Sequence, residues 1–226
     1  MSLQLRPTKI ERVGIECTDK YIHVLITFPD GDIQHVMFDT DPAKGYIIVS
    51  GKNFQTQMEK STDPDAFRFV PGFLAELFAS PEREFNLVSI KTSSLSSANG
   101  QVLKADKWNE FFDRIKWHFN SFEHKLKFRA FEVTSHPDLQ AREVHAFWPF
   151  LTPGTLSTFI HSGKENLNSS ERIRILSRTL QWKQAETVKT CFYNNVKIRD
   201  FCKLKNSVIR LQDFSFKLFR ELIEVS

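Results

Sequence analysis

The sequence has little of what marks several common protein classes. Its 226 residues include only 8 glycines and 9 prolines, which excludes collagen-like and broadly disordered chains. Neither glycine-rich phosphate-binding motif, GxGxxG or GxxxxGK[ST], occurs in it. No stretch reaches the roughly 18 apolar residues of a membrane span, and the first ten residues carry no apolar signal core. We therefore expect a soluble, globular, intracellular protein.

Cysteine is scarce as well. The three cysteines, Cys17, Cys191 and Cys202, leave one thiol over in any pairing and match no disulfide framework. Free cysteine packs as a small apolar residue in a reducing compartment, so we expect the protein in the cytoplasm, the nucleus or both. No CxxC, HExxH or HxxxH spacing is present, and the sequence therefore predicts no metal site and no cofactor.

Charge is nearly balanced. The chain has 31 basic and 27 acidic residues, a formal net charge of +4, and the two signs are interspersed without the basic stripe of a dedicated nucleic-acid binder. One segment, His124–Phe131, does interleave basic and aromatic residues, as phosphate contact and base stacking require. The preferred interpretation is a strand with a buried apolar face. A nucleic-acid-associated regulatory module that uses the mildly basic surface remains the alternative function.

Candidate catalytic groups do not form a convincing set. The GxSxG nucleophile motif is missing. Glu143 and His145 would suit acid–base chemistry, but positions i and i+2 of a helix do not share a face. His118 and His124, at the borders of a helical segment, are interpreted as solvated. We predict a protein that is not an enzyme and has no catalytic residues.

Phenylalanine is abundant, with 22 residues against 3 tyrosines and 4 tryptophans. Phenylalanine has no polar group, so this bias favours dry packing over hydroxyl chemistry. The strongest pattern lies between Lys107 and Phe122, where apolar residues recur at helical spacing and Asp106 would cap the helix. That stripe comprises Trp108, Phe111, Phe112, Ile115, Phe119 and Phe122.

The N-terminal part has the alternation of β-strands. Tyr21–Phe28 alternates with period two, Pro29–Asp32 supplies a turn in which Gly31 adopts positive φ, and Ile33–Phe38 returns. A second hairpin is predicted from Tyr46–Val49, turning at Ser50-Gly51, into Asn53–Met58.

After residue 60 helical and strand segments take turns, which indicates parallel strands joined by crossovers. The predicted strands are 85–91, 126–134, 155–161, 188–193 and 208–214, and the predicted helices are 67–78, 107–122, 144–151, one capped by Ser170 that carries Ile173, Leu176 and Leu180, and 216–225. Ser93–Gly100 is expected to be a mobile loop. An apolar-x-x-apolar-x-apolar motif recurs in Phe85–Ile90 and Phe128–Val133 and nearly in Leu156–His161. Such recurrence favours a leucine-rich-repeat-like solenoid over a doubly wound sheet.

Two strings in the second half carry a family resemblance. Trp148–Leu156 reads WPFLTPGTL, and Thr179–Ala185 reads TLQWKQA. Together they resemble the signatures of the FTH domain, the C-terminal module of a large class of nematode F-box proteins, and the resemblance extends from about Gly45 to the C-terminus. It implies a leucine-rich-repeat-like α/β module that binds other proteins. In the family's usual arrangement an F-box binds the Skp adaptor of a cullin ubiquitin ligase, and this module presents the target.

No F-box is visible in the chain, so we expect it to contact the Skp adaptor only if the full-length protein carries one. The matched residues also have a structural explanation. Pro153-Gly154 should end a helix, with Thr155 and Leu156 starting the next strand. Trp182, followed by the small Ala185, is predicted to be a core residue rather than a catalytic one.

These observations predict an α/β fold: a leucine-rich-repeat-like curved sheet with flanking helices and N-terminal antiparallel β-hairpins. Residues 1–60 would form the hairpin region and residues 61–226 an FTH-like helix–strand repeat domain, continuous with it. The predicted function is target-protein recognition without catalysis, as in F-box ubiquitin-ligase substrate adaptors.

The partner-binding surface is predicted from strand alternation alone, because outward positions of successive strands share one face. We name this set the binding strip: Ser89, Lys91, Glu132, Ile160, Lys189 and Arg210. Their apolar neighbours should face the helices: Val88, Ile90, Phe131, Val133, Phe159, Val188, Ile209 and Leu211. His161 stands where an inward aliphatic residue is expected, which leaves the register of its strand open.

Overall fold

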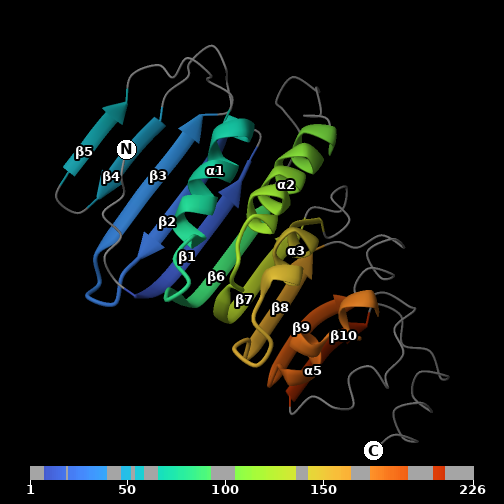
Figure 1. Cartoon of the computed structure of the whole chain (residues 1–226). Helices are drawn as coiled ribbons and strands as arrows, with labels where there is room; N and C mark the ends of the chain where they lie inside the picture. Colours follow the sequence, from blue (N-terminus) through green and yellow to red (C-terminus); the bar gives the residue numbers. More distant parts are fainter. Residues whose placement is uncertain are drawn as a thin grey trace, which may run out of the picture.

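Ten strands form one open mixed sheet in the order β10-β9-β8-β7-β6-β1-β2-β3-β4-β5 (Figure 1). The computed structural model describes residues 8–18, 20–39, 47–51, 54–58, 66–92, 105–135, 142–163, 174–192 and 206–211, with side chains described in all but 47–51, 54–58, 105–106, 163, 190–192 and 206–211. The strands are β1 (Lys9–Cys17), β2 (Tyr21–Thr27), β3 (Ile33–Asp39), β4 (Ile47–Gly51), β5 (Phe54–Met58), β6 (Glu84–Thr92), β7 (Lys127–Ser135), β8 (Thr158–Gly163), β9 (Thr187–Phe192) and β10 (Asn206–Leu211). The mixed α/β class predicted from the sequence is confirmed.

Antiparallel hairpins make up the N-terminal side of the sheet, as predicted. β2 and β3 pair across a turn in which Gly31 has φ of +83° and the Asp32 N–H donates to Asp30 Oδ1. β4 and β5 form the second hairpin, but its turn lies later than the predicted Ser50-Gly51. Both residues still belong to the ladder, where Ser50 lies opposite Gln55 and Gly51 lies opposite Phe54.

The first strand joins the two halves of the sheet. β1 is antiparallel to β2 on one side and parallel to β6 on the other. From β6 to β10 each strand runs parallel to the next, which confirms the crossover connections predicted from the alternating segments.

The helices α1, α2 and α3 lie over one face of the sheet (Figure 1). The described helical elements are α1 (Ala66–Phe78), α2 (Ala105–Asn120), α3 (Arg142–Phe147), the 3₁₀ turn η2 (Trp148–Phe150) and α5 (Leu180–Gln184). In α2 the predicted stripe from Trp108 to Phe119 is buried, and Phe122, just beyond the helix end, packs against the core. Asp106 is not the N-cap, because the helix already begins at Ala105.

Strand β8 begins three residues later than predicted. The N–H and the hydroxyl of Thr155 both donate to the Thr152 carbonyl, at 3.4 and 2.9 Å, so these residues close a turn and cannot join the ladder. Gly154 within that turn has φ of +85°, as expected for a glycine that ends a helical segment.

The helix predicted to carry Leu176 and Leu180 is broken between them. The Thr179 hydroxyl donates to the Leu176 carbonyl and accepts the Trp182 N–H, so Thr179 ends one helical turn and caps α5. Leu180 therefore does not continue the helix of Leu176, and 59% of its surface is exposed. Several other predicted features lie outside the described residues: Ser170, Ile173, the Ser93–Gly100 loop, Cys202 and the helix 216–225.

Aromatic rings fill the space between the helices and the sheet. Phe78 of α1 and Phe119 of α2 meet edge to face at 5.7 Å between ring centroids, and both contact Phe147 of α3. Phe128 and Phe131 of β7 contact Phe147 from below. This dry layer explains the excess of phenylalanine. Among the described helices, none is long and apolar enough to cross a membrane.

Candidate functional site

The two faces of the sheet differ because the strands alternate. In β6, Val88 and Ile90 are buried beneath the helices, whereas Ser89 is partly exposed and Lys91 is exposed on the other face. No described helix covers this second face, which we call the open face. The apolar residues that were predicted to face the helices are buried wherever their side chains are described: Val88, Ile90, Phe131, Val133, Phe159 and Val188.

Four residues of the binding strip form a single row across four parallel strands. Ser89 of β6 lies opposite Glu132 of β7. Glu132 lies opposite Ile160 of β8, and Ile160 lies opposite Lys189 of β9. Residues far apart in the sequence are thus brought side by side on the open face, although their role in binding stays a prediction.

The remaining two strip residues lie one step along the strands. Lys91 follows Ser89 by two residues, and its Nζ lies 3.1 Å from Glu16 Oε1 on β1. Val208 of β10 lies opposite Lys189 of β9. Arg210 follows Val208 by two positions and lies opposite Cys191. By backbone register Arg210 thus belongs to the same face, while Ile209 and Leu211 occupy the alternate positions.

His161 resolves the register of β8. The residue is 2% exposed on the helix-covered face, and its Nε2 lies 3.1 Å from Ser135 Oγ. Burial lowers the pKa of His161 to about 4, so the imidazole is neutral at neutral pH. Ile160 is consequently directed to the open face, as the alternation predicted.

Charge along the row is uncompensated within the described part of the chain. Glu132 and Lys189 stand two strands apart, roughly 10 Å at the usual strand spacing, which is too far for them to pair with each other. No described residue forms an ion pair with either. The row therefore presents a negative and a positive group on opposite sides of the partly exposed Ile160.

The open face extends further than the sequence suggested. Gly14 of β1 lies opposite Ser89, and Leu25 of β2 lies opposite Gly14, so the row continues into the N-terminal hairpins. Sequence patterns alone missed this extension, because β1 and β6 pair across about 75 intervening positions with no local signal.

A second group that sequence patterns missed is a buried polar cluster at the ends of β1 and β6. Thr92 donates its hydroxyl hydrogen to Glu143 Oε1 at 2.8 Å, and Glu143 is completely buried at the start of α3. Burial, and then the charges of Glu143 and Glu16, raise the pKa of the neighbouring Cys17 thiol. His145 is partly exposed, as expected for a position that does not share a face with Glu143. The cluster fastens α3 to the strand ends.

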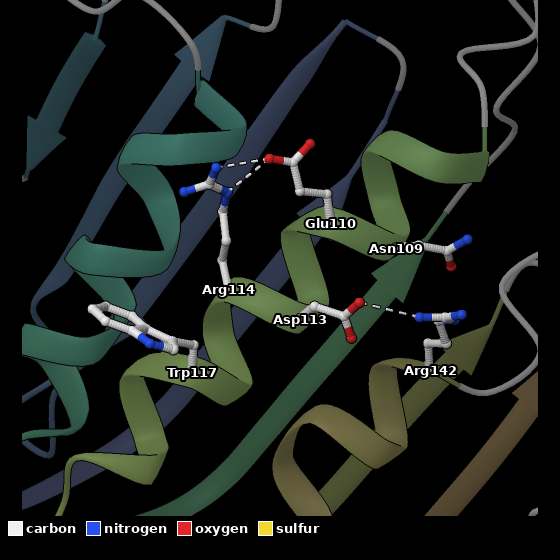
Figure 2. A pocket seen from close by; sticks show the side chains of 6 residues that line it. All are labelled: Asn109, Glu110, Asp113, Arg114, Trp117 and Arg142. Atoms are coloured by element: carbon white, nitrogen blue, oxygen red, sulfur yellow. Dashed lines mark hydrogen bonds and ion pairs between the residues drawn. The ribbon is translucent and has the colours of Figure 1, made fainter.

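A hollow of about 550 Å³ lies along the outer side of α2, next to the start of α3 (Figure 2). Its lining residues are Asn109, Glu110, Asp113, Arg114, Trp117 and Arg142. Arg114 Nη2 pairs with Glu110 Oε1 at 2.7 Å, and Arg142 Nη1 with Asp113 Oδ2 at 3.3 Å. Each of these four charged side chains therefore forms an ion pair within the hollow. The polar groups are paired with each other and do not point to a common ligand position. Trp117, 70% exposed, is its one large apolar surface.

Comparison with known proteins gives one finding. A family model described as the FTH domain matches residues 109–225, which include both motif strings, Trp148–Leu156 and Thr179–Ala185. The matched part begins within α2, so the N-terminal hairpins, α1 and β6 lie outside it. No curated protein and no solved structure matches the chain.

Proposed function

Because the chain belongs to the FTH domain family, we propose that it is a non-catalytic protein–protein interaction module that binds a target protein through the open face of its sheet. The observation that carries this proposal is the row formed by Ser89, Glu132, Ile160 and Lys189. It combines an apolar contact with two charges that no described residue pairs with, and such a combination gives an interface both affinity and orientation.

The row suggests the chemistry of the partner's surface. A complementary surface carries a basic group opposite Glu132, an apolar side chain against Ile160 and an acidic group opposite Lys189. Arg210 and Lys91 would add positive charge two residues further along their strands. Lys91 would then either give up its ion pair with Glu16 or contact Glu16 and the partner together.

We further propose that the parallel half of the sheet is curved as in leucine-rich repeats. The two-residue gap between Phe85 and Val88 is repeated between Phe128 and Phe131 on the neighbouring strand, and both strands are covered by helices on the same face. A bulky layer on one face only is the arrangement that bends a repeat stack and leaves the strand face inside the curve.

The family context extends the proposal to the cell. The module would act in the cytoplasm or the nucleus as the target-recognition part of an F-box type ubiquitin ligase. Contact with the Skp adaptor would come from an F-box joined to this module, whereas the open face would hold the target.

Affinity purification of the tagged chain tests the proposal. Proteins retained by the wild type should be lost by the double variant Lys189→Glu with Arg210→Glu, which reverses the positive end of the binding strip. The matched control, Lys116→Glu with Lys183→Glu, makes the same change in net charge at exposed helix positions away from the open face and should retain them. If both double variants retain the same proteins as the wild type, the binding strip is the wrong surface.

Nucleic-acid binding is less well supported than protein binding. Phe128 and Phe131 in the basic segment His124–Phe131 are buried, so these aromatic rings are not accessible for base stacking. A salt titration distinguishes the two functions, because affinity for phosphates falls steeply with salt concentration. We expect partner binding to survive a change from about 50 to 200 mM salt with little loss.

A further inference from the structure

Two histidines face each other on the antiparallel part of the open face. His23 Nε2 of β2 and His35 Nδ1 of β3 form a hydrogen bond at 3.1 Å, in which one ring nitrogen donates and the other accepts. The two imidazole planes are within 6° of parallel, with 5.3 Å between ring centroids. Both rings are partly exposed, so solvent and small ions reach them.

The separation of these nitrogens matches that of two ligands on one metal ion. Imidazole nitrogens bind Zn²⁺ at about 2.0–2.1 Å, which places two nitrogens about 2.9–3.4 Å apart for bond angles between a right angle and a tetrahedral one. The observed 3.1 Å lies within that interval. Metal binding would replace the hydrogen bond between the two rings, and both rings would rotate so that their lone pairs meet at a common point.

A carboxylate is positioned beside the pair. Glu16 of β1 lies directly opposite His23 in the ladder, where side chains on one face are about 5 Å apart at Cβ. Two imidazoles and one carboxylate, with a position left for water, are a common donor set for zinc.

The carboxylate is engaged elsewhere in the structure as it stands. Glu16 Oε1 contacts Lys91 Nζ at 3.1 Å, and the described residues contain no group of three or more such side chains already gathered tightly enough to hold a metal ion. Lys91 is exposed and Glu16 is partly exposed, so their contact is a surface ion pair. Surface ion pairs of this kind are weak.

We propose that His23 and His35 bind a divalent transition-metal ion of the zinc type, with Glu16 as the third protein ligand. Metal binding replaces the hydrogen bond between the two rings: the donor ring changes tautomer, so that both facing nitrogens bind the ion and each ring keeps its hydrogen on the outer nitrogen. It also releases Lys91, which is itself a residue of the binding strip, from Glu16. The test of this site requires no target protein.

Isothermal titration of the purified chain with Zn²⁺, and separately with Mg²⁺, tests the proposal. We expect one zinc ion to bind and magnesium not to bind, because magnesium prefers oxygen ligands. His23→Gln and His35→Gln should each weaken Zn²⁺ binding at least roughly tenfold, and Glu16→Gln should weaken it by a smaller factor. With Co²⁺ in place of Zn²⁺, the visible absorption of a site with nitrogen and oxygen ligands should appear in the wild type and disappear in His23→Gln.

His118→Gln is the matched control, because it removes a partly exposed histidine from α2, away from the pair, and should leave the affinity unchanged. Thermal unfolding without metal verifies that each variant is folded. Absence of zinc binding by the folded wild type would overturn the proposal. Equal affinities for the wild type and His23→Gln would overturn it as well, because the zinc would then be bound elsewhere, for example by the cysteines.

Discussion

At Trp182, three elements that are separate in the sequence come into contact. The indole is completely buried and lies 6.3 Å from the Trp148 ring and 5.9 Å from the Phe159 ring, measured between centroids. Trp182 lies within α5, and the small Ala185 ends that helix where the chain turns toward β9. The motif QWKxA is therefore explained by packing.

Replacing Trp182 by alanine should cost roughly 3–5 kcal/mol of the free energy of unfolding, because it removes a large buried ring and leaves a cavity. Chemical denaturation measures the loss. Leu180→Ala, on the same short helix but 59% exposed, is the control and should change stability by less than about 0.5 kcal/mol. Equal effects of the two substitutions would contradict the assignment of Trp182 to the core.

His161 predicts a dependence of stability on pH. Its folded-state pKa of about 4 lies below the 6.5 of an unfolded histidine, so between these values the unfolded chain binds a proton that the folded chain does not. Stability from this residue is complete above pH 6.5 and is lost as the pH falls toward 4, by an amount of the order of 3 kcal/mol.

Urea denaturation of the wild type and His161→Gln at several pH values between about 8 and 4 tests this expectation. Glutamine keeps a polar group for Ser135 but does not titrate. The difference in stability between the two proteins should be constant above neutral pH, and below pH 6.5 it should shift in favour of the variant. Parallel pH profiles of the two proteins would show that His161 does not titrate with a lowered pKa.

Among the elements, the turn before β8 depends on a glycine that other residues replace poorly. Gly154 has φ of +85°, a conformation that costs L-residues roughly 1–2 kcal/mol, so Gly154→Ala should destabilise the protein by about that amount. Gly14, within strand β1, is the contrasting case. A Cβ there would meet Ser89 Oγ at 3.5 Å and Leu25 Cβ at 3.6 Å, which are ordinary contacts.

Gly14→Ala should therefore leave stability unchanged or raise it by up to about 1 kcal/mol, because alanine restricts the unfolded chain. Thermal unfolding of the two variants side by side measures the contrast. A larger loss for Gly14→Ala than for Gly154→Ala would contradict the backbone conformations described here.

The elements also show what the sequence can and cannot predict. The buried stripe of α2 and the hairpin of β2 and β3 follow from local periodicity, which reports the side of an element that is buried. The break at Thr179 could not be predicted from local periodicity, because the spacing of Leu176 and Leu180 fits a continuous helix. The hydroxyl of Thr179 instead accepts a hydrogen bond from Trp148 Nε1, a tertiary contact that no local pattern encodes.

The same limit applies to the candidate sites. The row through Glu132, Ile160 and Lys189 could be predicted, because consecutive parallel strands keep one face in common. The pairing of β1 with β6, which brings Glu16 to Lys91, could not, since it depends on a long-range contact. The buried Glu143 was judged only by its distance along the helix from His145, and its true partner Thr92 is 51 positions away.

For the whole molecule, the arrangement of layers separates the aromatic core from the face that we propose to bind a partner. The helices and the aromatic layer cover one face of the sheet, and the other face carries the polar and partly exposed residues of β1–β3 and β6–β9. Substitutions on the open face should thus affect binding more than folding. Membership in the FTH family agrees with this division, because the two motif strings contribute to the covered face.

The most direct test of the binding surface is the dissociation constant of a recovered partner for a charge swap that keeps the net charge. Glu132→Lys combined with Lys189→Glu exchanges the two charges on either side of Ile160. Glu76→Lys combined with Lys116→Glu makes the same exchange at exposed positions of α1 and α2. We predict that the first pair weakens binding at least about tenfold, or about 1.4 kcal/mol, while the protein stays folded and the second pair binds as the wild type does. Unchanged affinity of the first pair would contradict the assignment of the open face as the partner-binding surface.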